Sequence, residues 1–180
     1  MINLIIIDNY DSFTYNLVHY LEPYCKEITI FRNDEINHDL ISNEHKILLS
    51  PGPGLPSENK ELNYSIEKYH LTNNILGVCL GFQAIGQFFG AELHNLKKVR
   101  HGIQTQLEIL NHDFLFKNVP NNTRPSYNVT YVVQSLSAGS NNAINKLSAS
   151  GTVIIVIADS SSPSIARSSY KNYLQSLQRN

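Results

Sequence analysis

The feature that most constrains this chain is a cysteine between two glycines at the end of an apolar run, in the stretch Gly77-Val78-Cys79-Leu80-Gly81. The run 75–78 is typical of a buried strand, and the apolar spacing over 83–89 is typical of a helix. A sharp turn from strand into helix brings the two elements so close that residues without a Cβ are needed beside the turn. The pattern therefore predicts a nucleophile elbow with Cys79 at its apex.

The expected chemistry of Cys79 follows from its place at the start of a helix. Backbone N–H groups and the helix dipole favour a thiolate there. The alternative is that Cys79 is a small buried apolar residue, which is the common fate of a free cysteine. Glycines on both sides favour the nucleophile.

Composition and charge exclude several classes of protein. The formal net charge of −1, with acids and bases intermixed, gives no basic face for nucleic acid and no polybasic arm for a membrane. The apolar runs are too short to span a bilayer, and the first residues have no basic region of a signal peptide. The two cysteines, Cys25 and Cys79, make no disulfide framework. We therefore expect a cytoplasmic protein with a single domain over residues 1–180.

The first half of the chain alternates between strand and helix patterns. Such alternation predicts an α/β fold, an open parallel sheet flanked by helices with its site at the carboxyl ends of the strands. Asp8, the loop Pro51-Gly52-Pro53-Gly54 and Cys79 all follow expected strands. The strands are expected at 3–7, 27–31, 46–50 and 75–78, and the helices at 13–20, around 62–69 and at 83–89, with a weak helical turn at 39–43.

The pattern changes after Gly90. Residues 102–110 and 129–136 suit antiparallel structure appended to the sheet, and 153–158 has the pattern of a buried strand. A terminal helix is expected around 170–177. The serine- and asparagine-rich stretch 135–145 is interpreted as a surface loop.

A cysteine that attacks a carbonyl needs N–H donors for the oxyanion that forms. Two sources are expected: the N–H of Leu80, directly after the nucleophile, and the stiff loop 51–54, where glycine permits close approach of the backbone. The alternative for that loop is an ordinary rigid turn. Neither cysteine has a Cys or His at ligand spacing, so no metal site is expected, and no cofactor.

Three motifs carry a family resemblance. They are Asp8-Asn9-Tyr10-Asp11-Ser12-Phe13-Thr14-Tyr15-Asn16-Leu17, Leu48-Leu49-Ser50-Pro51-Gly52-Pro53-Gly54 and Gly77-Val78-Cys79-Leu80-Gly81-Phe82-Gln83-Ala84-Ile85-Gly86. Together they resemble the class I (triad) glutamine amidotransferases. Within that family the chain looks like the small subunit (component II) of anthranilate synthase or of aminodeoxychorismate synthase. The match runs through roughly residues 1–119.

The resemblance implies a flavodoxin-like sheet and hydrolysis of the side-chain amide of L-glutamine through a thioester on Cys79. It also implies transfer of the ammonia to a chorismate-binding synthase large subunit, in tryptophan or folate biosynthesis. By motif, Gly52, Pro53 and Gly54 line the glutamine site, and Gln83 contacts the substrate. The oxyanion N–H groups would come from Gly54 and Leu80.

The last third of the chain departs from the family pattern. The family carries its catalytic His and Glu in a His-Pro-Glu segment, and the corresponding stretch here is, at best, Ser161-Ser162-Pro163-Ser164-Ile165. No histidine follows His112. The chain therefore lacks a histidine at the place where the family has its catalytic base. Residues from about 120 onward are atypical of the family.

Three interpretations remain open. In the first, an upstream histidine such as His101 serves as the base. In the second, the subunit is catalytically impaired or inactive and has a binding role. In the third, the sequence after about residue 120 is altered relative to a functional ancestor. Loss of a general base typically costs 10²–10⁴-fold in rate, so slow or absent glutamine hydrolysis is expected. The main alternative outside the amidotransferases is a flavodoxin-like flavin carrier. That interpretation would leave the cysteine elbow unexplained.

Overall fold

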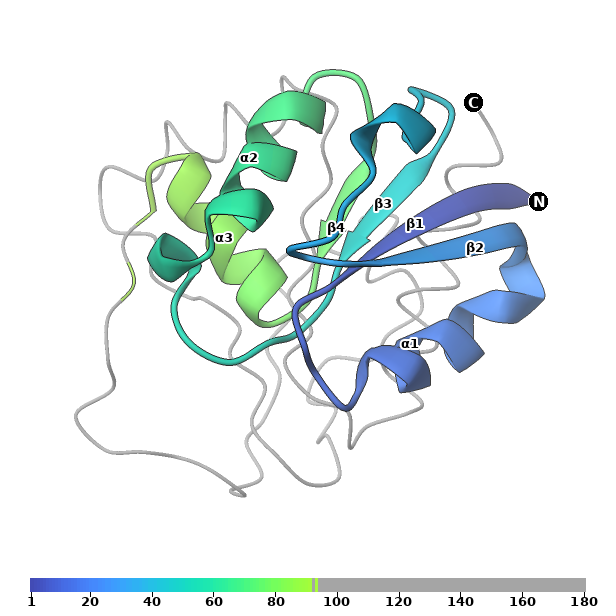
Figure 1. Ribbon diagram of the computed structural model, residues 1–180, viewed down its shortest axis with the longest axis horizontal. Helices are drawn as coiled ribbons and strands as arrows, with labels where there is room; N and C mark the ends of the chain where they lie inside the picture. Colours follow the sequence, from blue (N-terminus) through green and yellow to red (C-terminus); the bar gives the residue numbers. More distant parts are fainter. Residues whose placement is uncertain (92, 94–180) are drawn as a thin grey trace, which may run out of the picture.

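A computed structural model describes residues 1–91 and 93, and in them four parallel strands form one sheet in the order β2-β1-β3-β4 (Figure 1). This confirms the open parallel sheet flanked by helices. The strands are β1 (Ile2–Asp8), β2 (Cys25–Arg32), β3 (Lys46–Leu49) and β4 (Ile75–Gly77). The α-helices are α1 (Thr14–Leu21), α2 (Lys60–Tyr69) and α3 (Leu80–Phe88), and the 3₁₀ turns are η1 (Glu22–Tyr24), η2 (His38–Leu40) and η3 (Pro56–Glu58).

Two elements differ from the sequence expectation. Helix α3 begins at Leu80, three residues before the expected start, because its first turn is held by packing on the sheet rather than by propensity. The weak helical turn expected at 39–43 is a single 3₁₀ turn, η2, in which the Asn37 side chain accepts a hydrogen bond from the Asp39 N–H. The elements expected after Gly90, the appended antiparallel segment and the 1–180 domain extent lie outside the described residues.

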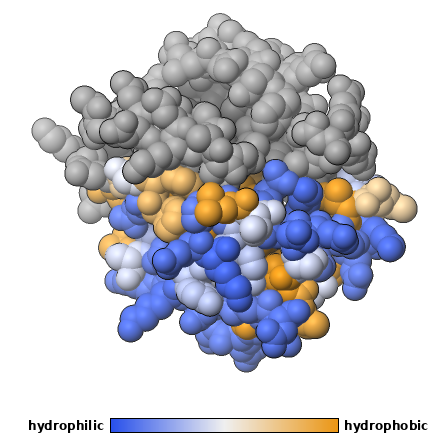
Figure 2. Space-filling view, turned by 90° about the horizontal axis from the view of Figure 1, so that it is seen from above, coloured by the Kyte–Doolittle hydropathy of each residue, from blue (hydrophilic) through white to orange (hydrophobic). Residues whose placement is uncertain are grey.

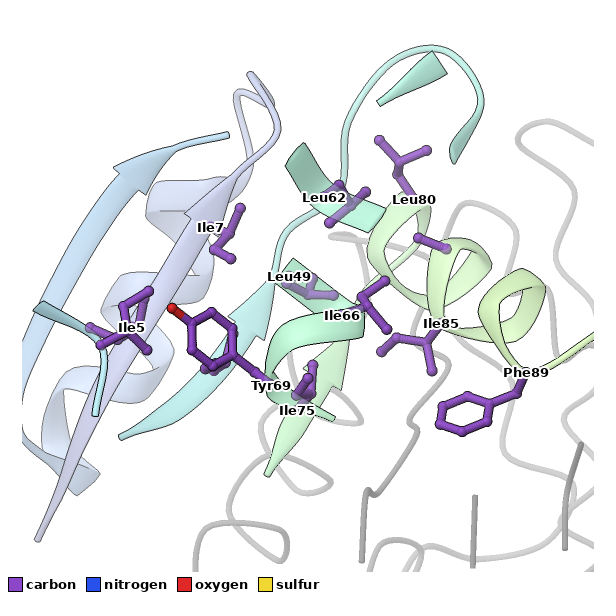
Figure 3. Packing of buried hydrophobic residues seen from close by; sticks show 13 residues of the cluster. Ile5, Ile7, Leu49, Leu62, Ile66, Tyr69, Ile75, Leu80, Ile85 and Phe89 are labelled. Carbon is purple, nitrogen blue, oxygen red and sulfur yellow. The ribbon is translucent and has the colours of Figure 1, made fainter. Parts of the chain in front are cut away.

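The unbroken apolar run of β1 is explained by burial on both faces of the sheet. Leu4 and Ile6 point to the face covered by α1, while Ile5 and Ile7 point to the face covered by α2 and α3 (Figures 1 and 3). A strand covered on both faces has no solvated side, so the polar half of the usual alternation is absent.

The layer under α2 and α3 is the larger of the two apolar clusters. Leu62, Ile66 and Tyr69 of α2 recur at helical spacing and pack against the sheet, as the sequence predicts (Figure 3). Helix α3 adds Leu80 and Ile85 to the same layer. The position of α3, and therefore of the residue before it, is fixed by this layer.

The order of the strands reverses between β1 and β3. From β1 the chain passes to β2 on one side, then returns across β1 to β3 and continues outward to β4. In open α/β sheets ligands bind at the carboxyl ends of the strands where the order reverses. The loops that begin at Asn9 and at Ser50 meet at this point.

Hydrophilic side chains cover most of the described surface in the view of Figure 2, with hydrophobic ones between them in separate groups. No helix in residues 1–91 is long and apolar enough to cross a membrane.

Candidate active site

Cys79 occupies a strained turn between β4 and α3. Its backbone has φ 52° and ψ −108°, a conformation that residues other than glycine rarely adopt. The Val78 N–H donates to the Leu49 carbonyl at 3.0 Å, which continues the sheet to the residue before the cysteine, and the Gly81 N–H closes the turn onto the Val78 carbonyl at 3.0 Å. The nucleophile-elbow geometry expected from the sequence is confirmed. Such strain gathers at functional sites.

The two glycines around the elbow are required by close contacts with backbone. A Cβ on Gly77 would lie 2.5 Å from the Phe82 nitrogen. A Cβ on Gly81 would lie 2.5 Å from both the Cβ and the carbonyl oxygen of Leu49. The strand and the helix therefore approach too closely for any side chain at these two positions.

Burial raises the pKa of the half-buried Cys79 thiol, and this effect outweighs the others. The backbone N–H of Leu80 lowers that pKa, the charge of Asp11 raises it, and the N–H of Gly52 lowers it. The sequence expectation that the start of the helix would favour the thiolate is therefore wrong in its net sign. The N–H groups stabilise the thiolate as expected. Removal of water from the sulfur destabilises it by more, so the net pKa is raised.

The loop after β3 brings the Gly52 N–H to the cysteine. Gly52 packs so tightly that an added Cβ would lie 2.5 Å from the Cβ of Asn9 and 2.8 Å from Cδ2 of Leu80. Pro53 and Gly54 are exposed beyond it, and Gly54 has φ +78°. A donor from this loop and the Leu80 N–H thus converge on one sulfur atom. The loop donor directed at the thiol is that of Gly52, and an oxyanion role for Gly54 stays a prediction.

Asn9 is a residue of the site that the sequence analysis named only within the first family motif and gave no role. It is 2% exposed, its N–H donates to Ser50 Oγ, and its Nδ2 donates to the Ser50 carbonyl, both at 2.8 Å. Its Oδ1 accepts from Nδ2 of Asn33 at 3.1 Å and of Asn59 at 3.4 Å. The available signal was position, because Asn9 and Ser50 each follow one of two neighbouring parallel strands.

Asp8 organises the loop that leads from β1 into α1. Its carboxylate is buried and accepts from Thr14 Oγ1 at 2.7 Å and from the Asp11 N–H at 3.3 Å. The Arg32 guanidinium lies 3.5 Å from the other carboxylate oxygen. These contacts hold Asp8 in a structural role beside the site.

Helix α3 supplies the remaining predicted residues. Leu80 is buried and Gln83 is half-buried, and the Gln83 N–H donates to the Cys79 carbonyl at 2.9 Å. The structure therefore brings Gly52 and Leu80 to Cys79 and places Gln83 one turn along the helix.

The four histidines in the described part of the chain lie near the amino ends of the strands or on the last turn of α1. His19 lies 3.5 Å from Glu22, and His38 contacts Tyr69 OH at 2.9 Å. His45 contacts Ser42 Oγ at 2.9 Å directly before β3, and His70 ends α2. His94, His101 and His112 lie outside the described residues. Within the residues that are described, no three His, Cys, Asp or Glu side chains gather as a metal site.

Comparison with known proteins gives a family for this geometry. Residues 5–166 match the family model described as "Glutamine amidotransferase class-I". The chain is 41% identical over 120 residues to anthranilate synthase component 2 of Pyropia yezoensis, an alignment covering 66% of this chain and 63% of that protein. It is 46% identical over 101 residues to anthranilate synthase component 2 of Pseudomonas aeruginosa, covering 55% and 50% respectively. The matched part thus spans less than two thirds of the length of these relatives.

A solved structure supports the fold. A Thermoplasma acidophilum protein, provisionally described as one of the subunits of GMP synthase, superimposes with a TM-score of 0.68 at 17% identity, covering 100% of this chain and 98% of that one. At that identity the likeness concerns the fold alone.

Proposed function

The chain belongs to the class I glutamine amidotransferase family, and from that membership we propose that it is the glutamine-hydrolysing subunit of a chorismate-utilising synthase, in anthranilate or aminodeoxychorismate synthesis. The observation that carries the proposal is the elbow: Cys79 stands in a strained turn with two backbone N–H groups directed at its sulfur. The partner would be the synthase large subunit, which receives the ammonia.

The reaction proceeds by acyl transfer to sulfur. The Cys79 thiolate attacks the side-chain amide carbon of L-glutamine, and the carbonyl oxygen becomes an oxyanion held by backbone N–H groups. The C–N bond then breaks, the nitrogen takes a proton and leaves as ammonia, and a thioester remains. Water attacks the thioester, the C–S bond breaks, and glutamate is released as the thiol is restored.

The Cys79 thiol needs a general base for this chemistry. Because burial raises the pKa of Cys79, the sulfur is protonated near neutrality and needs a base before it can attack. The four described histidines have their contacts at other places in the fold. We therefore assign the base, where one operates, to the part of the chain that contains His94, His101 and His112, or to no residue of this chain.

The glutamine site would be formed by the exposed end of the loop after β3 and by the first turn of α3. Gly52 presents its N–H to the sulfur, Pro53 and Gly54 follow it at the exposed end of the loop, and Gln83 lies on the neighbouring helix. Ligands of open α/β sheets bind at this edge. Binding of glutamine between these two segments would place its amide over Cys79.

A second candidate is a catalytically impaired subunit that binds its partner without rapid turnover. The observation in its favour is that residues 113–180 of the printed sequence contain no histidine and no glutamate. Loss of base assistance typically lowers the rate 10²–10⁴-fold.

The deciding experiment measures ammonia release from L-glutamine by the purified chain, alone and with a large subunit of either synthase, with Cys79→Ser as control. Cys79-dependent release that rises with one large subunit supports the proposal and identifies the pathway. Absent release, together with labelling of Cys79 by a glutamine-like chloromethyl ketone, supports the impaired subunit. Absence of both results contradicts a glutamine site at this edge of the sheet.

A further inference from the structure

The orientation of one peptide group decides whether the Gly52 N–H reaches the cysteine. The bond between Pro51 and Gly52 is trans, so its carbonyl oxygen and its N–H point in opposite directions. Rotation of this peptide about its flanking bonds would turn the N–H away from the sulfur and turn a carbonyl oxygen toward it. Glycine at position 52 makes such rotation sterically easy. Something must therefore hold the peptide.

The Ser50 hydroxyl contacts the carbonyl end of that peptide. Ser50 Oγ donates to the Pro51 carbonyl oxygen at 2.7 Å, and the side chain has no exposed surface. The hydroxyl is itself held, because Oγ accepts from the Asn9 N–H at 2.8 Å. A chain of two hydrogen bonds therefore runs from the end of β1 through Ser50 to the peptide that carries the Gly52 N–H.

Asn9 fixes this chain in space. Its Nδ2 donates to the Ser50 carbonyl at 2.8 Å, and its Cβ packs on Gly52, so that Ser50 is held from both its backbone and its hydroxyl. The side-chain amides of Asn33 and Asn59 in turn donate hydrogen bonds to the Oδ1 of Asn9. A buried polar network in which each member has partners is rigid, and it has one favoured arrangement.

We propose that Ser50 is a positioning residue: its hydroxyl anchors the Pro51 carbonyl and thereby aims the Gly52 N–H at the Cys79 sulfur. Ser50 acts through the peptide and does not touch the reacting atoms. The inference deepens the proposed function, because the same N–H would support the thiolate from which acylation begins. Its test needs no glutamine hydrolysis, since it measures the thiol directly.

The experiment is the rate of alkylation of Cys79 by iodoacetamide between pH 6 and pH 11, followed by mass spectrometry of the Cys79 peptide so that Cys25 is counted separately. In Ser50→Ala we expect the midpoint of the pH profile to move up by about one unit, which is what loss of one hydrogen bond to the thiolate gives. The rate at pH 7 then falls only about threefold, because a more basic thiolate is also more nucleophilic.

Two controls separate positioning from general damage. Ser65 is a second buried serine, and its hydroxyl has no hydrogen-bond partner among the described residues, so Ser65→Ala removes the same group without touching the site. The side chains introduced by Ser50→Thr and Ser50→Val have nearly the same shape, and only the threonine keeps a hydroxyl. This pair decides the question if Ser50→Ala does not fold.

The proposal expects Ser50→Thr and Ser65→Ala to keep the wild-type midpoint, and Ser50→Val to shift as Ser50→Ala does. Equal midpoints for the threonine and valine variants would overturn it. A wild-type chain that hydrolyses no glutamine, yet shows this pattern, would contradict the proposed function and leave the positioning role supported.

Discussion

Gly81 lies against Leu49 so closely that a Cβ on the glycine would meet the Cβ and the carbonyl oxygen of the leucine at 2.5 Å. The leucine belongs to β3 and the glycine to the first turn of α3, so this contact sets how far the elbow stands from the sheet. Backbone atoms on the Leu49 side cannot move aside as the end of a flexible side chain could. The contact therefore fixes the depth of Cys79 in the molecule.

We expect Gly81→Ala to destabilise the fold by about 1–3 kcal/mol or more, because the added methyl overpacks the junction of helix and strand. Gly86→Ala is the matched control in the same helix: its Cβ would meet only Ala91 Cβ, at 3.6 Å. Because alanine favours helix over glycine, the control should gain up to about 1 kcal/mol. Urea unfolding measures both, and equal effects of the two substitutions would contradict the close contact.

Asn59 connects α2 to the site. Its Oδ1 accepts from the Leu62 N–H at 3.0 Å as the N-cap of α2, and its Nδ2 donates to Asn9. We expect Asn59→Ala to lower the free energy of unfolding by about 1–2 kcal/mol. Asn37→Ala removes a similar cap from the exposed turn η2 and should cost about 0.5 kcal/mol or less. Thermal or urea unfolding compares them, and a larger loss at Asn37 would contradict the prediction.

Gly54 adopts φ +78°, where an L side chain is strained, and an added Cβ would lie 2.7 Å from Glu58 Oε2. That carboxylate accepts from the Leu55 N–H at 2.9 Å and would have to shift. Gly90, at φ +94° with nothing within 4 Å of its Cβ position, carries the same strain without a contact. Both alanine variants should lose about 1–2 kcal/mol. If the loop binds glutamine, KM should rise in Gly54→Ala alone, and an unchanged KM would contradict a glutamine site there.

Burial raises the pKa of Cys25 to about 11, so the fold favours its neutral thiol. An unfolded cysteine ionises at about pH 8.5. The stabilisation from this difference is therefore fully present below that pH and is lost as pH rises toward 11. We expect wild type to lose roughly 2 kcal/mol more than Cys25→Ala between pH 8 and pH 10.5. Because both chains share every other titrating group, the difference in urea unfolding isolates Cys25, and parallel curves would contradict the assignment.

The sequence by itself predicted much of the fold. The apolar run of β1 and the helical spacing of Leu62, Ile66 and Tyr69 are local patterns, and burial on both faces of a parallel sheet produces both. The role of the two elbow glycines could be predicted from sequence. Two backbones that nearly touch leave no room for a Cβ, and glycine is the residue that lacks one.

The tertiary structure alone decided the state of the thiol and the residues that serve it. The pKa of Cys79 depends on how much water the surrounding chain removes, and the start of the helix could predict only the opposing contribution. Asn9 and Ser50 are 41 positions apart in the chain and carry no periodic pattern. They meet because β1 and β3 are neighbours in the sheet, and strand order arises from long-range packing that no local stretch of sequence encodes.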